Sequence, residues 1–107
     1  MSIDIAAVLC DTRETKQLVR ANTGMSATEC AALHTLAGVE QMRMGYLAKE
    51  IGLSPAGMTR LVQRLERAGW AERRRSQIDH RVVAVYLTDE GRTRAQLLAM
   101  ELTGVSR

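Results

Sequence analysis

The stretch from Ser54 to Gly91 constrains the fold more than any other part of the chain. Its first residue, Ser54, has a side-chain oxygen that can accept a hydrogen bond from an unpaired amide of a first helical turn. Pro55 follows, at a position where its missing N–H has no consequence. Next comes an apolar stripe with helical spacing, formed by Met58, Leu61, Val62 and Leu65. Gly69 suits the left-handed residue that ends a helix, so we predict a helix over residues 55–68.

The hydrophobic period changes after that helix. Residues 71–75 form a short basic segment and residues 82–87 are rich in β-branched side chains, so we expect both to be strands. Residues 76–81 between them are polar and of hairpin-loop length. Thr88 can then cap a further helix over residues 89–102. This order predicts a mainly α fold with a small β-hairpin wing, which is a winged helix-turn-helix.

The part of the chain before this stretch supplies the other helices. Residues 26–29 read Ser-Ala-Thr-Glu, a capping box that predicts the start of a helix continuing to Gly38. Residues 44–51 predict a short helix, which a Gly-containing turn joins to the next helix as in a helix-turn-helix. Residues 2–22 predict a first helix. Its interrupted apolar face favours packing on a partner subunit.

Length and composition limit the class of protein. A chain of 107 residues with 46% hydrophobic and 25% charged residues is expected to form one folded domain over residues 1–107. No apolar run reaches the ~20 residues of a membrane span, and the N-terminus lacks a signal-peptide pattern. The scarcity of aromatic residues disfavours a protein that stacks single-stranded bases. From the lack of a span and a signal peptide we expect a cytoplasmic protein. Because no nucleophile–base pair, paired acids or Gly-rich phosphate loop is evident, we expect that it is not an enzyme and uses no cofactor.

Positive charge is concentrated between residues 60 and 81. This stretch holds seven arginines and three acidic residues, a net charge of +4, whereas the whole chain carries only +3. A lone helix with this pattern is more simply a solvated arginine face. Because a basic ribbon follows the helix, a surface that binds double-stranded DNA is the better interpretation.

Three short motifs flank the ribbon or lie within it. They are Leu65-Glu66-x-x-Gly69, Asp79-x-Arg81 and Leu87-Thr88-x-x-Gly91. With their neighbours from residue 25 to about residue 102, they resemble the MarR family of bacterial transcriptional regulators. The resemblance implies a homodimer on pseudo-palindromic operator DNA, a repressor released by a small molecule or an oxidant. It implies dimerisation helices near residues 2–22 and 89–102 and a DNA-binding core near residues 25–88.

The resemblance and the side-chain chemistry together assign roles at this surface. Arg81 matches the wing arginine that enters the minor groove, where a planar guanidinium suits a narrow electronegative groove. Asp79 matches the acid that orients it. Arg60 and Gln63 are expected to project from the helix and to read base edges in the major groove. The other candidate contacts, mainly to phosphates, are Ser54, Thr59, Arg64, Arg73, Arg74, Arg75 and His80.

Two departures from the family pattern keep other interpretations open. Ala56 and Gly57 stand where many relatives carry Ser or Thr, so readout is expected to depend more on Arg60, Gln63 and the wing. Both ends are shorter than is usual in the family, so the dimer is expected to use the terminal helices or to be rearranged. One alternative is an antirepressor, a winged helix that pairs with another regulator. A second is an architectural protein that binds DNA without sequence preference.

The two cysteines are the candidate sensors of an oxidant. Cys10 lies on the expected first helix, roughly where oxidant-sensing branches of the family keep a reactive thiol. The simpler interpretation is a small buried hydrophobe or an idle thiol, because no cation or helix N-terminus near it in the sequence would activate it. Cys30 fits the hydrophobic staple of its helix. Cys30 and His34 alone lack the further ligands that a metal site needs.

Overall fold

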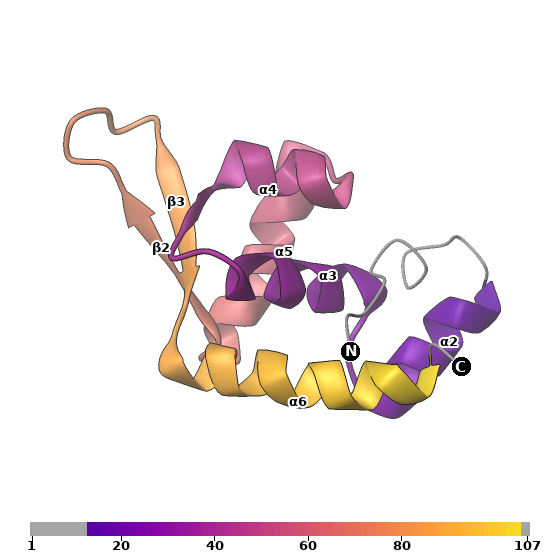
Figure 1. Cartoon of the computed structure of the whole chain (residues 1–107). Coiled ribbons are helices and arrows are strands. Elements are labelled where there is room, and N and C mark those ends of the chain that lie inside the picture. Colours follow the sequence, from indigo (N-terminus) through magenta and orange to yellow (C-terminus); the bar gives the residue numbers. More distant parts are fainter. Residues whose placement is uncertain (1–12, 106–107) are drawn as a thin grey trace.

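A computed structural model describes residues 13–105 of the protein, and within this range the chain forms five helices and three strands. Their order is α2 (Arg13–Thr23), α3 (Ala27–Ala37), β1 (Met42–Arg43), α4 (Met44–Ile51), α5 (Pro55–Arg67), β2 (Ala71–Arg75), β3 (Val83–Leu87) and α6 (Asp89–Val105). The β2–β3 ribbon projects from one end, while α2 and the last turns of α6 lie at the other (Figure 1). The expected mainly α fold with a wing is confirmed. Cys10 and the first half of the helix expected over residues 2–22 lie outside the described residues.

Capping interactions set the start of α3 as predicted. The Ser26 side-chain oxygen accepts from the Glu29 amide at 3.2 Å, and the Ser26 amide donates to the Glu29 carboxylate at 3.4 Å. Cys30, the expected staple residue, is buried in the core together with Met25, the residue before the cap.

Both ends of α5 also follow from local chemistry. Ser54 accepts from the Gly57 amide at 3.1 Å, and the predicted apolar stripe is buried. At the other end the Trp70 amide donates to the Leu65 carbonyl at 2.9 Å, and Gly69 has φ 81°. This is a Schellman ending, in which the left-handed residue is a glycine because it has no Cβ to clash. The helix ends at Arg67, one residue earlier than predicted.

The sheet has a third strand that the sequence does not reveal. Its order is β1-β3-β2 and all pairs are antiparallel, with Arg43 opposite Ala84 and Arg74 opposite the same residue from the other side. The prediction of two strands was therefore incomplete, because β1 has only two residues and no alternation can be recognised over that length. Likewise β3 begins at Val83 rather than at residue 82.

The last helix extends further than predicted. The sequence predicted a helix over residues 89–102, but α6 continues past Gly104 to Val105. A glycine costs about 1 kcal/mol relative to alanine in a helix, which contacts along the rest of α6 can offset. Thr88 caps the start of the helix as expected, since its side-chain oxygen accepts from the Gly91 amide at 3.0 Å.

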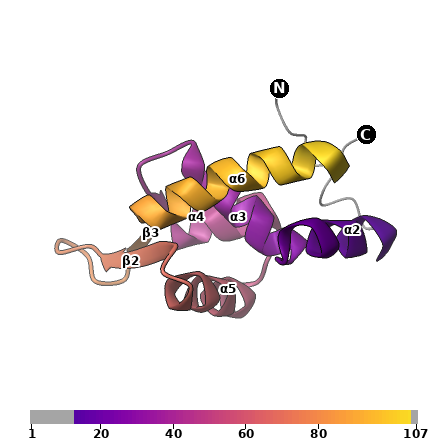
Figure 2. The same cartoon turned by 90° about the horizontal axis from the view of Figure 1, so that it is seen from below.

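The core forms where α3 is sandwiched between α5 and α6 (Figure 2). The largest side chains buried there include Leu33, Leu36, Leu47, Met58, Leu61, Leu65 and Leu98. These side chains come from four helices, α3, α4, α5 and α6, so burying them together fixes the mutual placement of the helices. The β3 residue Val85 is fully buried and joins the base of the wing to the same core.

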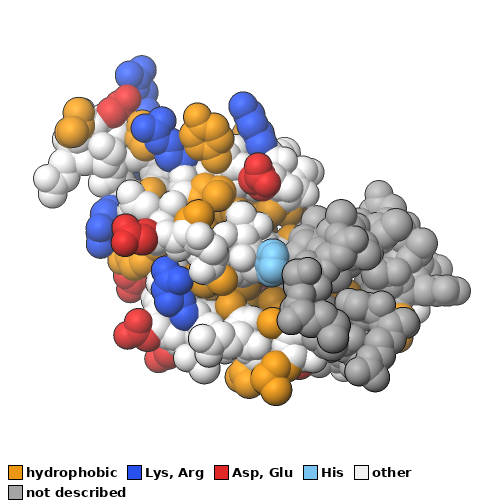
Figure 3. Space-filling model, in the orientation of Figure 1, with side chains coloured by type: hydrophobic (Ala, Val, Ile, Leu, Met, Phe, Trp, Pro, Cys, Tyr) orange, Lys and Arg blue, Asp and Glu red, His pale blue; other side chains and the backbone are white. Residues whose placement is uncertain are grey.

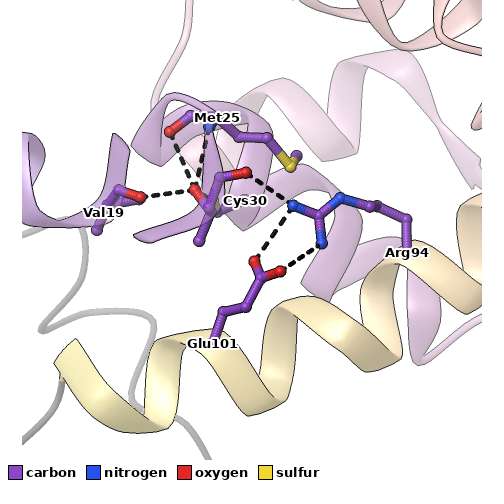
Figure 4. A network of polar contacts seen from close by, with 6 residues as sticks. Val19, Met25, Cys30, Arg94 and Glu101 are labelled. Carbon is purple, nitrogen blue, oxygen red and sulfur yellow. Dashed lines mark hydrogen bonds and ion pairs between the residues drawn. The ribbon is translucent and has the colours of Figure 1, made fainter. Parts of the chain in front are cut away.

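A polar cluster ties the end of α2 to α6 (Figure 4). The Arg94 guanidinium donates to the Thr23 backbone carbonyl at 2.8 Å and to both oxygens of Glu101 at 3.2 Å. The Thr23 hydroxyl donates to the Val19 carbonyl at 2.6 Å and lies 3.7 Å from the Cys30 sulfur. These contacts satisfy the buried polar groups at the α2–α3 turn.

Candidate nucleic-acid interface

Helix α5 has one buried face and one exposed polar face. The apolar stripe faces the core, and Arg60 and Gln63 are exposed on the other side. The Thr59 hydroxyl donates to the Pro55 carbonyl at 3.0 Å, so its oxygen lone pairs remain for accepting. The exposed side therefore presents a guanidinium and an amide, groups that can bond to base edges.

The wing loop holds Arg81 in a defined orientation. Arg81 Nε lies 3.1 Å from one Asp79 oxygen and its Nη2 lies 3.3 Å from the other, while the Arg81 amide also donates to Asp79 at 3.0 Å. These hydrogen bonds, with the nearby charge of Arg43, hold the pKa of the Asp79 carboxyl below its usual value. The side chain of Arg81 is nonetheless 91% exposed. Asp79 thus orients the guanidinium without covering it.

Backbone contacts fix the shape of the loop that carries this pair. The Ser76 side-chain oxygen accepts from the amides of Ile78 and Asp79 at 3.2 Å each. The Val82 amide donates to the Asp79 carbonyl at 2.9 Å, and an Arg75 guanidinium nitrogen donates to the His80 carbonyl. The tip is therefore an ordered turn, in which the His80 side chain is exposed.

Arginines among the predicted phosphate contacts also interact with acidic or aromatic side chains of the chain itself. Arg73 forms an ion pair with Glu66 of α5 at 3.0 Å, and Arg64 lies 3.8 Å from Glu29 of α3. Arg74 lies over the Tyr86 ring, 5.0 Å from its centroid. These side chains are partly exposed, so such pairs contribute little to stability and can exchange partners.

An open groove of about 690 Å³ lies between the wing and the starts of α4 and α5. We call it the helix–wing groove; its lining residues are Arg43, Met44, Gly45, Tyr46, Ala48, Lys49, Leu53, Pro55, Met58, Thr59, Arg81, Val82 and Val83. It brings together Thr59 of α5 and Arg81 of the wing, two predicted site residues more than 20 positions apart in the sequence. The predicted residues Arg64, Arg73, Arg74 and Arg75 do not line it.

Sequence reasoning missed three polar residues of this groove: Arg43, Tyr46 and Lys49. All three are exposed. They precede the basic stretch and carry no motif, so the available signal was only that the first helix of a helix-turn-helix crosses the DNA backbone. Basic side chains gather over the wing and α4, with hydrophobic side chains between them (Figure 3).

The described residues contain no group of three or more His, Cys, Asp or Glu side chains placed to hold a metal ion. Burial raises the pKa of the Cys30 thiol, which favours the unreactive protonated form. From Arg13 to Val105, no helix is long and apolar enough to cross a membrane.

Comparison with known sequences places these features in a family. The family model described as MarR family matches residues 23–82. YdgJ of Bacillus subtilis (strain 168), an uncharacterized HTH-type transcriptional regulator, is 34% identical over 74 residues. That match covers 69% of this chain but only 45% of YdgJ.

Solved structures share the fold. Overoxidized AbfR bound to DNA matches with a TM-score of 0.80 and 24% identity, over 86% of this chain and 70% of that one. A mutant MarR from E. coli complexed with operator DNA matches with a TM-score of 0.79 and 20% identity, over 88% and 70%. AbsC, a MarR family transcriptional regulator from Streptomyces coelicolor, has a TM-score of 0.80 and 22% identity, over 96% and 69%.

Proposed function

The chain belongs to the MarR family, and on that premise we propose that it is a transcriptional regulator which binds double-stranded DNA. In this proposal α5 enters the major groove, where Arg60 and Gln63 read base edges. The wing enters the adjacent minor groove, where Arg81 is attracted by the electronegative floor. The protein acts in the cytoplasm, where a bacterial chromosome lies, and it catalyses no reaction.

One observation carries the proposal. Thr59 of α5 and Arg81 of the wing line the same open groove, so the two elements present their polar groups to the same side of the molecule. A duplex can therefore meet both at once. The Asp79–Arg81 pair supports the same conclusion, because a guanidinium that is oriented but 91% exposed is ready for an external partner.

We further propose that the active form is a homodimer joined through the terminal helices. Large apolar side chains are exposed on both α2 and α6, namely Leu18, Leu97 and Met100. A second copy of the chain would remove them from water. Two recognition helices one duplex turn apart, about 34 Å, would then read a pseudo-palindromic site.

Repression relieved by a small molecule or an oxidant is the regulation we propose. An effector would act by changing the spacing of the two recognition helices. For an oxidant, Cys10 is the candidate sensor, since Cys30 is fully buried and its thiol is held protonated. Labelling with a thiol reagent before and after peroxide treatment would test this role.

The proposal is tested by selecting random duplexes against the purified protein at physiological salt, with its mass in solution measured in parallel. A dimer that enriches a palindrome is the expected result. Arg81→Ala should weaken binding to the selected duplex while leaving the helix content unchanged. A monomer that enriches no sequence and instead captures a related regulator would contradict the proposal and favour the antirepressor alternative.

A further inference from the structure

The loop at the tip of the wing carries one large apolar side chain among polar ones. Ile78 is 98% exposed, whereas Met100 on the proposed dimer surface is 75% exposed. Single exposed apolar side chains are common, so the position of Ile78 decides its significance. It belongs to the loop that the proposed function places in the minor groove. We propose that Ile78 contacts the floor of that groove and selects an A·T pair there, an inference that rests on the proposed function and adds a residue that determines specificity.

The turn at the tip fixes the backbone of Ile78 relative to Arg81. The Ser76 side-chain oxygen accepts from the Ile78 amide and from the Asp79 amide, each at 3.2 Å. Asp79 in turn accepts from Arg81 Nε at 3.1 Å. One ordered turn therefore carries both side chains, and a groove that receives Arg81 lies within reach of Ile78, three residues away.

The surroundings of Ile78 favour DNA over an apolar protein surface as its partner. Ile78 lines an open hollow together with Arg43, Arg74 and Arg75, and no Asp or Glu of the described residues belongs to that lining. An apolar surface that covered the isoleucine would remove these guanidinium groups from water without a counter-charge. A minor groove instead presents phosphates on both sides of a floor of base edges, so it can meet the cations and the isoleucine together.

One chemical group distinguishes the two kinds of base pair on the floor of this groove. Both kinds present acceptors there, and a G·C pair adds the 2-amino donor of guanine. The side chain of Ile78 has no acceptor for that donor. A contact with a G·C pair would therefore bury the amino group without a replacement hydrogen bond, and it would also fill the space into which the branched side chain extends. An A·T pair avoids both costs.

Inosine isolates the amino group in a binding experiment, because an I·C pair differs from a G·C pair only in lacking it. Starting from the selected duplex, each A·T pair outside the major-groove contacts is replaced in turn by G·C and by I·C. At one pair we expect G·C to weaken binding of the wild-type protein by at least about fivefold and I·C to restore it to within about twofold.

Variants at the tip then assign this preference to one side chain. Ile78→Ser should bind duplexes with G·C and with I·C at that pair equally, to within about twofold, whereas Ile78→Val should keep the wild-type preference. Gln77→Ser is the matched control, because it shortens the neighbouring exposed side chain of the same loop, and it should also keep the preference. Since Ile78 is almost fully exposed, its replacement leaves the core intact, and circular dichroism should show unchanged helix content.

The outcomes separate this inference from the proposed function. If Ile78→Ser keeps the wild-type preference at every pair while Arg81→Ala weakens binding, the assignment of Ile78 is wrong and the proposed function stands. The assignment also fails if G·C weakens wild-type binding at none of the tested pairs, or if I·C weakens it as much as G·C does. If the wild-type protein binds no duplex, the proposed function fails and the assignment with it.

Discussion

Replacement of Gly91 by alanine tests the corner where the chain leaves the sheet and enters α6. A Cβ at Gly91 would lie 1.9 Å from the Trp70 carbonyl oxygen and 2.8 Å from its carbon. Both are backbone atoms, so no side-chain rotation can relieve the contact. The start of α6 would have to move away from the turn that follows α5.

That movement breaks further interactions. The Thr88 amide donates to the Trp70 carbonyl at 3.0 Å, and the Thr88 hydroxyl donates to the Gly69 carbonyl at 2.6 Å. Overpacking costs about 1–3 kcal/mol and each lost hydrogen bond about 0.5–1.5 kcal/mol, so we expect Gly91→Ala to lower the free energy of unfolding by about 2–6 kcal/mol. Domains of this size are stable by only about 5–15 kcal/mol, so this loss would remove a large part of the free energy of unfolding.

Urea unfolding followed by Trp70 fluorescence measures this directly, because Trp70 is the only tryptophan and lies at the altered corner. Gly45→Ala is the matched control: Gly45 is also helical, but a Cβ there meets nothing within 4 Å. It should leave stability unchanged or raise it by up to about 1 kcal/mol, since alanine is the better helix former. A Gly91→Ala protein within about 0.5 kcal/mol of wild type would refute the close approach.

Three further predictions follow from the polar contacts. Asp79→Asn should remove one titration from the stability of the protein. Because hydrogen bonds to Arg81 depress the folded pKa of Asp79, its contribution to the free energy of unfolding is full above the ordinary value of 3.8 and is lost as pH falls through the lower folded value. Urea titrations at decreasing pH should therefore show a smaller acid-induced loss of stability in the variant than in the wild type, and an equal loss would contradict this. Arg94→Met should lower the free energy of unfolding by about 1–3 kcal/mol in urea titrations, because it leaves the Thr23 carbonyl and Glu101 without their charged partner; equal stability would contradict this. Cys30, in a Cys10→Ser background, should react with an alkylating reagent only at the rate of unfolding, and rapid labelling of the native protein would show that the thiol is accessible.

The sequence determined those features that depend on near neighbours in the chain. The caps at Ser26, Ser54 and Thr88 and the stop at Gly69 involve hydrogen bonds across three to five residues, so their residue types predict them. The buried stripe of α5 follows from its period in the same way. The Asp79–Arg81 contact is equally local, and the family resemblance together with the chemistry of the two side chains predicted it.

Contacts between distant segments could not be predicted in this way. Strand β1 exists because Met42 finds a partner in Val85, and nothing in two residues signals a pairing across that distance. The Arg94 cluster and the close approach of Gly91 to Trp70 likewise need α6 in place. The sequence marked Gly91 as part of a motif, and the fold shows why a side chain does not fit there.

The candidate interface likewise combines features that the sequence predicts with features that only the tertiary structure decides. The composition of residues 60–81 already indicated a DNA-binding surface, because the net positive charge of this stretch does not depend on how the chain folds. Only the tertiary structure showed which cations share a surface: it paired Arg73 with Glu66 and brought Arg43 and Lys49 from earlier in the chain to the groove beside Arg81. Neighbours in sequence set local conformation, whereas burial of the shared core decides which distant side chains face the same partner.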